Sequence, residues 1–171
     1  MQSQNIRVAD DSLEHMASEL VSQFLTFELN QEIYGVNILG IKEIIDYGSI
    51  TKVPMVSDCI AGVINLRGSV VPVINLASRF SQTSANRTKK SSVIIVEITY
   101  ETEKMEVGIA VDVVNEVIDV RESEIEPSPS FGTKIRSDFI SGMAKVKDEL
   151  LVMLNVEKVL SVTELSLLES E

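Results

Sequence analysis

The sequence is poor in the side chains from which most catalytic centres are built. Its 171 residues contain one histidine, one cysteine and no tryptophan. The histidine, His15, lies in a polar, acidic N-terminal segment, so we expect neither a serine–histidine or cysteine–histidine pair nor a multi-histidine metal site. The eight glycines form neither of the common phosphate-binding loops. The sequence therefore predicts a protein that is not an enzyme and that needs no metal or cofactor.

Positive charge is also scarce. The chain carries 26 acidic against 15 basic side chains, a formal net charge of −11. Binding to nucleic acid or to anionic lipid depends on clustered lysine and arginine, so neither is an expected partner. No run of about 18 apolar residues is present, and the N-terminus lacks the basic-then-apolar order of a signal peptide. We expect a cytoplasmic protein without direct membrane insertion.

What the chain does contain is an internal repeat of short apolar segments, the first copy at about 24–80 and the second at about 93–160. Gly35 and Gly108 fall at matching places, and the last segments of the two copies correspond at an offset of 80 residues. Each copy holds about five short segments joined by turns, a spacing that favours small antiparallel barrels or strongly bent sheets. Because so small a unit has a marginal core, we expect two units packed side by side, with or without an exchanged strand, and a groove between the two lobes.

Alternation of apolar and polar residues and β-branched composition mark the expected strands. They are 24–29, 33–38, 41–45, 50–54 and a hairpin at 62–76 in the first copy, and 93–98, 107–111, 114–120, 125–129 and a hairpin at 140–156 in the second. The segments outside the repeat are a tail at 1–20, mobile or a short helix, a polar connector at 81–92, and a C-terminal helical tail at 163–171.

The hairpin at 62–76 carries a single charged side chain, Arg67, in a neutral stretch from Cys59 to Ser78. Two β-branched segments flank Arg67-Gly68, and glycine tolerates the positive φ that tight turns require, so we expect Arg67 at the tip of a β-hairpin. A guanidinium on a rigid turn is either a solvated charge or a contact for a partner. In the second copy the turn is Lys147-Asp148-Glu149, so a partner of one tip need not bind the other.

The order of these motifs resembles the CheW-like chemotaxis coupling proteins. The resemblance rests on Tyr34-Gly-Val, Glu43-Ile-Ile45, Ile50-Thr51, Val53-Pro54, the run Gly62-Val-Ile-Asn-Leu-Arg-Gly68, and Val71-Pro-Val-Ile74. It extends over most of residues 21–162. It implies a mainly β fold with two interlocked five-stranded barrel subdomains, SH3-like or OB-like, a groove between them and a short C-terminal helix.

The same resemblance implies a function. Such proteins are non-catalytic adaptors that link the cytoplasmic tips of chemoreceptors to the regulatory domain of a chemotaxis histidine kinase, in arrays at the inner face of the membrane. By similarity, the receptor's helical hairpin would touch Ile38, Ile41, Glu43, Gly62, Asn65 and Arg67. The kinase would meet barrel surfaces at the ends of both lobes, through residues that the sequence does not identify, and a chain that is monomeric when free would join rings in the array. The alternative is a small β-barrel ligand-binding or scaffold module outside chemotaxis.

Three positions depart from the family pattern. Many members have aspartate at the positions of Asn75 and Asn155 and a basic residue at the position of Ala77. Since the two asparagines correspond across the repeat, we interpret them as residues that cap or bend the strand ends.

Overall fold

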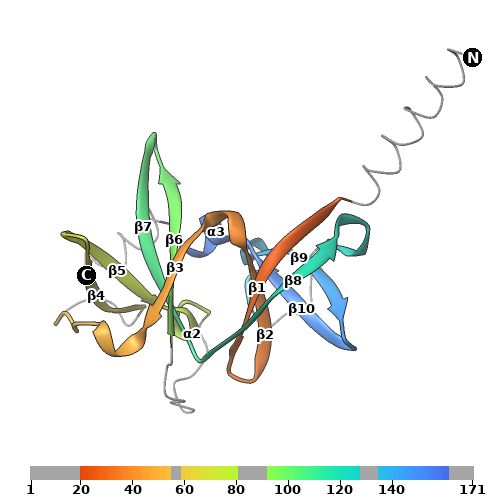
Figure 1. Cartoon of the computed structure of the whole chain (residues 1–171), viewed down its shortest axis with the longest axis horizontal. Coiled ribbons are helices and arrows are strands. Elements are labelled where there is room, and N and C mark those ends of the chain that lie inside the picture. Colours follow the sequence, from red (N-terminus) through yellow and green to blue (C-terminus); the bar gives the residue numbers. More distant parts are fainter. Residues whose placement is uncertain (1–19, 55–58, 81–91, 128–134, 162–171) are drawn as a thin grey trace, which may run out of the picture.

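The structure, a computed structural model, describes residues 20–54, 59–80, 92–127 and 135–161. The expected tail at 1–20 except its last residue, almost all of the connector at 81–92 and the C-terminal tail at 163–171 lie outside these residues. Ten strands form two five-stranded sheets, which stand side by side in Figure 1. No helix among the described residues has the length and apolar character needed to span a bilayer.

Lobe 1 is the sheet with strand order β8-β1-β2-β10-β9. Its strands are β1 (Val21–Leu29), β2 (Glu32–Asn37), β8 (Val113–Arg121), β9 (Ile140–Val146) and β10 (Glu149–Leu154). All neighbours are antiparallel except β2 and β10, which run parallel.

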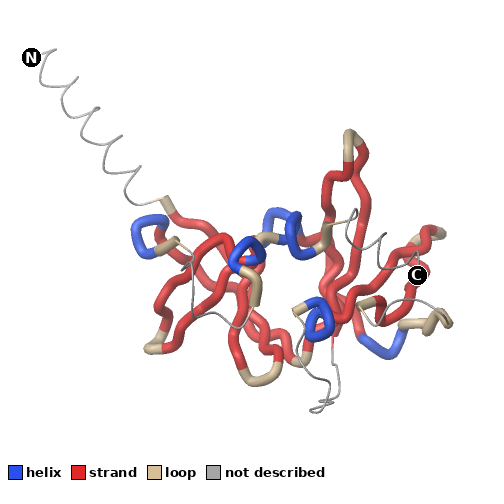
Figure 2. Tube along the Cα trace, turned by 180° about the vertical axis from the view of Figure 1, so that it is seen from behind, coloured by secondary structure: helices blue, strands red, loops and turns tan. Residues whose placement is uncertain are grey.

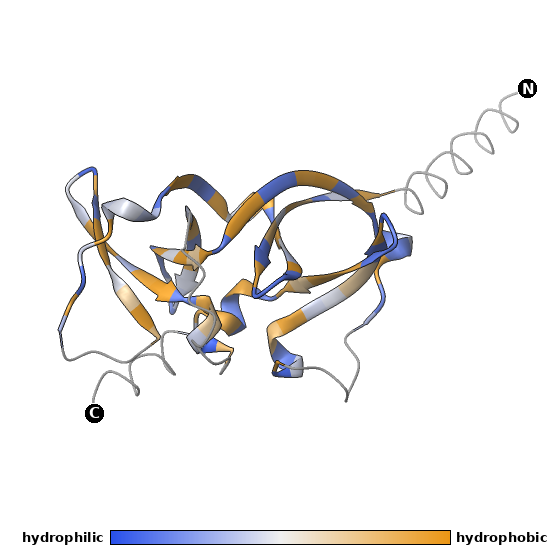
Figure 3. Ribbon diagram, turned by 90° about the horizontal axis from the view of Figure 1, so that it is seen from below, coloured by the Kyte–Doolittle hydropathy of each residue, from blue (hydrophilic) through white to orange (hydrophobic). Residues whose placement is uncertain are grey.

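Lobe 2 is the sheet with strand order β3-β6-β7-β5-β4. Its strands are β3 (Ile41–Asp46), β4 (Ile60–Leu66), β5 (Ser69–Asn75), β6 (Ser92–Tyr100) and β7 (Glu103–Val111). Here the parallel pair is β5 with β7. Exposed residues alternate with more buried ones along β3 and β9, because successive side chains point to opposite faces of a sheet. The central strands β6 and β7 instead contain continuous buried runs, and Figure 3 colours the strands by hydropathy.

The two lobes do not follow the two sequence repeats. The β1–β2 hairpin of the first repeat lies in lobe 1 with β8, β9 and β10 of the second, and the β6–β7 hairpin of the second repeat lies in lobe 2 with β3, β4 and β5 of the first. The interlocked, mainly β architecture with two five-stranded units is thereby confirmed. The element exchanged is a whole hairpin, so each lobe contains strands from both 24–80 and 93–160.

Helical segments are short. They are α2 (Leu76–Arg79), α3 (Val156–Val159) and the 3-10 turns η1 (Ile38–Gly40), η2 (Tyr47–Ser49), η3 (Glu122–Glu124) and η4 (Ser137–Phe139). Figure 2 shows α2 and α3 between the two groups of strands.

Most expected strands are present, but two are not. Residues 50–54 and 125–129 were expected to be strands, and among their described residues the structure has only single bridges, Thr51 with Val63 and Glu126 with Met143. Pro72 favours an edge strand on sequence grounds, yet β5 lies between β7 and β4. The parallel pairing of β5 with β7 begins at Val73, directly after the proline, so Pro72 precedes the paired stretch on that side.

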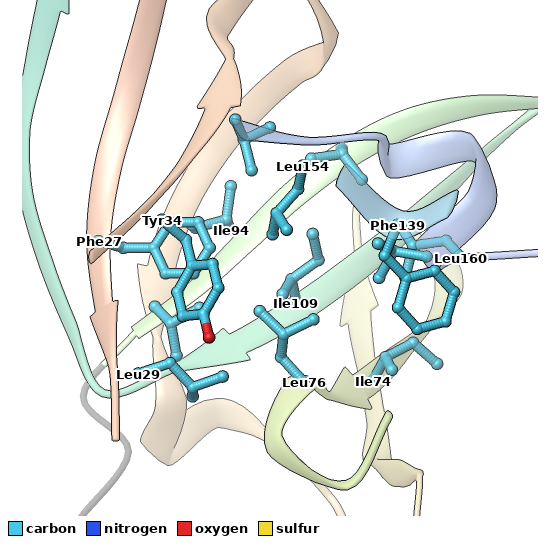
Figure 4. Packing of buried hydrophobic residues seen from close by; sticks show 14 of the residues in the cluster. Phe27, Leu29, Tyr34, Ile74, Leu76, Ile94, Ile109, Phe139, Leu154 and Leu160 are labelled. Atoms are coloured by element: carbon cyan, nitrogen blue, oxygen red, sulfur yellow. The ribbon is translucent and has the colours of Figure 1, made fainter. Parts of the chain in front are cut away.

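The largest apolar core lies between the lobes rather than inside either one. It takes side chains from β1 and β2, from β6 and β7, and from the short helices that follow β5 and β10. Four aromatic rings run through it in sequence, with centroids 5.9 Å apart for Phe27–Tyr34, 5.5 Å for Tyr34–Phe80 and 5.9 Å for Phe80–Phe139. Figure 4 shows Phe27, Tyr34 and Phe139 among the aliphatic residues of this core. Each such ring pair adds about 0.5–1.5 kcal/mol beyond its buried area.

Arg79, at the end of α2, ties the two lobes together by hydrogen bonds. Its side chain is buried, and its Nε donates to the carbonyl of Val159 at 2.7 Å while a second nitrogen lies 3.4 Å from the carbonyl of Lys158. These are carbonyls at the C-terminal end of α3, where a cation is favourable. The guanidinium also lies 4.7 Å from the centroid of the Phe139 ring, which Arg136 covers at 4.4 Å. Hydrogen bonds from Arg136 hold the pKa of Asp138 below its ordinary value.

We predict that Arg79→Met lowers the free energy of unfolding by about 1–3 kcal/mol, because it leaves the buried carbonyl of Val159 without the donor from Arg79. Urea unfolding of the two proteins measures this difference. Arg136→Met is the matched control: Arg136 contacts the same ring, but its side chain is 49% exposed, so its loss should cost less than half as much. Equal losses in the two variants would contradict the role given to Arg79.

Candidate functional site

Arg67 lies at the tip of the β4–β5 hairpin, as the sequence predicts. Leu66 pairs with Ser69, which leaves Arg67 and Gly68 as a two-residue turn. Both have positive φ, 49° and 83°, as a type I′ hairpin turn requires. Glycine adopts this backbone without strain, whereas arginine does so at a cost of about 1–2 kcal/mol. The same backbone conformation occurs at Gln31, Glu101 and Lys147, so it does not by itself distinguish Arg67 from other turn residues of the chain.

The Arg67 guanidinium is held by two carboxylates from other strands. One nitrogen donates to Oε1 of Glu43 on β3 at 2.9 Å, and another lies 3.7 Å from Oε2 of Glu106 on β7, beyond hydrogen-bond distance. Because β3 and β4 are the two ends of the strand order in lobe 2, the first contact joins opposite edges of a strongly curved sheet. The Arg67 side chain is still 65% exposed, so guanidinium donors remain available to a partner.

Further charges surround this pair. Glu106 lies directly opposite Glu97 on the antiparallel β6–β7 pair, an arrangement that is unfavourable for two like charges. Lysines offset it: the Nζ of Lys42 and of Lys104 lie 3.1 Å and 3.8 Å from the carboxylate of Glu97. The end of lobe 2 therefore carries a network of acidic and basic side chains, and Arg67 is its cation on the β4–β5 turn.

The other expected contact residues lie on η1, β3 and β4. Ile38 and Ile41 are partly buried against the core between the lobes, and Asn65 is exposed on β4. Between the two isoleucines, Leu39 at the middle of η1 is 90% exposed, an apolar side chain that the sequence did not single out. Asn37 caps η1 by accepting from the Leu39 N–H at 2.9 Å, so this turn is fixed in place.

Gly62 has a packing role. Thr51 and Val63 exchange two backbone hydrogen bonds of 2.8 Å, and a Cβ on Gly62 would lie 2.4 Å from the Thr51 carbonyl oxygen. The same arrangement recurs in lobe 1, where Glu126 bridges Met143 and a Cβ on Gly142 would lie 2.6 Å from the Ile125 side chain. These glycines permit the chain to pass across β4 and β9.

The tip of the β9–β10 hairpin repeats the ion pair of lobe 2 in another form. Lys147 and Asp148 also have positive φ, 50° and 65°, and the Lys147 Nζ lies 3.2 Å from Oε1 of Glu116 on β8. Glu116 corresponds to Glu43: it is the second residue of Asn-Glu-Val-Ile-Asp in β8, as Glu43 is the second residue of Lys-Glu-Ile-Ile-Asp in β3.

Among the described residues, no group of three or more His, Cys, Asp or Glu side chains is arranged to hold a metal ion.

Comparison with known proteins places this geometry in a family. Residues 23–164 match the CheW-like domain. The chain belongs to the CheW-like family. It is 33% identical over 156 residues to the chemotaxis protein CheW of Klebsiella aerogenes, covering 91% of this chain and 92% of that protein. It is 36% identical over 138 residues to CheW of Bacillus subtilis, covering 81% and 86%.

A solved CheW structure agrees. The crystal structure of the scaffolding protein TtCheW from Thermoanaerobacter tengcongensis superposes with a TM-score of 0.73 at 36% identity, covering 82% of this chain and 88% of that one. The family assignment and the fold class expected from the sequence motifs are thereby confirmed. The contact residues by themselves are not tested by these likenesses and remain predictions.

The two asparagines that depart from the CheW-like pattern behave differently. Asn155 caps α3, its side chain accepting from the Lys158 N–H at 3.3 Å. Asn75 makes no such bond at α2, and its Oδ1 is buried without a hydrogen-bond partner. The structure therefore shows a cap at Asn155 and none at Asn75, and both asparagines stand where a strand ends and a short helix begins.

Glu106 is a member of the Arg67 site that sequence reasoning missed. An acidic residue directly before the apolar run Val107–Val111 was its signal, of the kind that singled out Glu43 within 41–45. Arg79 had no comparable signal, because its partners are backbone carbonyls 79 and 80 residues away.

We predict that Gly62→Ala destabilises the fold by about 1–3 kcal/mol, because the new methyl group meets the carbonyl oxygen of Thr51, a residue that two backbone hydrogen bonds to Val63 hold in place. The midpoint of urea unfolding measures the change. Gly40→Ala is the control, since a Cβ there meets nothing closer than 4.0 Å. Equal midpoints for the two variants would show that Thr51 moves away at no cost.

Proposed function

We propose that the chain is a non-catalytic adaptor that couples the cytoplasmic tips of chemoreceptors to a chemotaxis histidine kinase. Support comes from its CheW-like relatives, which are named as chemotaxis proteins and which it matches over most of their length. The observation that carries the receptor contact is Arg67, an exposed guanidinium held in a strained turn at the edge of lobe 2. In this proposal the protein is cytoplasmic, monomeric when free, and recruited to receptor arrays, where it joins rings.

The proposed receptor contact combines aliphatic burial with one oriented charge. Ile38 and Ile41 offer partly buried aliphatic surface, and exposed Leu39 extends it. A helical hairpin that covers these residues buries apolar area, while Arg67 and Glu43 set its orientation and disfavour wrong partners. Gly62 is buried, so its effect on the receptor passes through the position of β4. Asn65 supplies a polar contact on the same strand.

Glu43 competes with any receptor carboxylate for the guanidinium of Arg67, and this competition sets how strongly the receptor carboxylate must bind. Glu43 already accepts one of the guanidinium donors, so a partner either shares Arg67 with Glu43 or displaces it. Exposed ion pairs contribute about 0.2–1 kcal/mol, a small barrier to such an exchange. Weak individual contacts of this kind suit an array, where many act together.

The test is Arg67→Asn, which turns the tip into Asn-Gly, the preferred sequence for a type I′ turn. We expect unchanged or higher thermal stability together with a loss of about 10- to 100-fold in affinity for a receptor cytoplasmic fragment, since a charge-assisted hydrogen bond contributes about 1.5–3 kcal/mol. Surface plasmon resonance measures the affinity, and receptor-dependent autophosphorylation of the kinase measures coupling.

Lys147→Asn, the equivalent change at the lobe 1 tip, is the matched control and should leave receptor affinity unchanged. Retention of receptor binding by Arg67→Asn would remove Arg67 from the contact. If the unmodified protein retains neither a receptor fragment nor a kinase, alone or together, the adaptor function itself is wrong.

A further inference from the structure

The β6–β7 hairpin of the second repeat is longer than its counterpart, the β1–β2 hairpin of the first. The strand pairing of β1 with β2 runs three residue pairs beyond Gly35 before the turn. That of β6 with β7 runs five pairs beyond the corresponding Gly108 and ends with Tyr100 opposite Glu103. Residues 99–104 therefore have no counterpart in the first repeat. Figure 1 shows this end of the hairpin rising above the neighbouring strands.

Tyr100 lies on the face of β6 that turns toward lobe 1. Residues two apart on a strand share a face, so Tyr100 follows Val96 and Ile98 in one row. Both of these residues are buried in the core between the lobes, and Met105, opposite Ile98 on β7, is partly buried against it. Tyr100 extends the row beyond this core and is 40% exposed. The extension thus presents an aromatic side chain at the rim of the space between the lobes.

The aliphatic surface proposed to contact the receptor adjoins the same row. Ile41 of β3 pairs with Val96, so their side chains lie next to each other on one face of the sheet. The turn η1 lies beside β6, because a Cβ on Gly40 would be 4.0 Å from the carbonyl oxygen of Glu97. Leu39, at the middle of this turn, is 90% exposed. The apolar surface therefore continues from η1 and β3 onto the longer hairpin.

The opposite face of the extension belongs to the charge network of lobe 2. Thr99 and Lys104 pair with each other and point to the same side as Glu97. The Lys104 Nζ lies 3.8 Å from the carboxylate of Glu97. The two faces of the extension thus differ in chemistry, and exposed Thr99 offers a control position on the face that turns away from lobe 1.

We propose that Tyr100 is a further contact for the receptor's helical hairpin, beyond the residues expected from the family resemblance. The inference rests on the proposed adaptor function and deepens it. Strands rise about 3.4 Å per residue, so Tyr100 lies about 14 Å along β6 from Val96, the partner of Ile41. Two adjacent α-helices, each about 10–12 Å across, span that distance. The tyrosine ring offers aliphatic receptor side chains a large, rigid surface at a low cost in conformational entropy.

The test measures the affinity of the full chain for a receptor cytoplasmic fragment by surface plasmon resonance. Tyr100→Ser should weaken binding about 5- to 20-fold, since it removes most of an aromatic contact surface. Tyr100→Phe should keep affinity within about twofold, because the ring supplies the contact. Thr99→Ala, one residue away on the other face, should change nothing. Thermal unfolding and affinity for the kinase should be the same in all four proteins.

A shortened hairpin tests the extension as a whole. Replacing residues 99–104 by Asn-Gly joins Ile98 to Met105 through a two-residue turn, the length of the β1–β2 turn. This variant should lose as much receptor affinity as Tyr100→Ser; should it fail to fold, the point variants decide.

Unchanged receptor affinity in Tyr100→Ser would overturn the inference while leaving the adaptor function in place. Equal losses in Tyr100→Ser and Thr99→Ala would also overturn it. Weaker binding to the kinase with unchanged binding to the receptor would make the kinase the partner of Tyr100 instead. If the unmodified chain binds no receptor fragment, the proposed function fails and this inference fails with it.

Discussion

The exchange of hairpins between the two repeats is the constraint on which the rest of the structure depends. Each lobe is completed by two strands of the other repeat, through the parallel pairs β2–β10 and β5–β7. Separating the two repeats would therefore break strand pairing in both sheets. Separating the two lobes would expose the core between them. Gly108 shows how tight the junction is, since it pairs with Val73 of β5 and a Cβ on it would lie 3.1 Å from the Val73 side chain. The two small units are stable together because neither is complete alone.

This exchange also fixes where the candidate contacts lie. With the lobes locked by the aromatic rings and by Arg79, the hairpin tips that carry Arg67 and Lys147 are held in a constant relation to each other. An adaptor benefits from such rigidity, because its effect on a partner is a small bias in orientation, which a flexible linker between lobes would dissipate. In the proposed coupling role, Arg79 would act only through the geometry of the two lobes that it joins.

Local features were predictable from the sequence and long-range ones were not. The Arg67-Gly68 turn follows from two β-branched segments around a glycine, and the repeat follows from the offset of 80 residues. Assignment of hairpins to lobes was beyond prediction, because the parallel pairing of β2 with β10 joins residues more than 110 positions apart with no local signal. Thr51 was expected in a strand, yet it meets β4 only once, at the place where Gly62 leaves room. Glu106 had a weak signal, and Arg79 had none.

The comparison of the lobes separates what the fold requires at each hairpin tip from what it leaves free to vary. Backbone requirements are met identically at both tips: positive φ at the turn and a glycine beneath the returning chain. Side chains that the fold does not need have diverged, so that the pair Arg67–Glu106 stands where the other lobe has Lys147 and Ile33. A rigid protein whose two hairpin tips have similar backbones but different side chains can bind two different partners at a fixed distance from each other. Since the divergence falls on exposed rims and spares the turns, we infer that partner recognition, rather than stability, governs the residues at these tips.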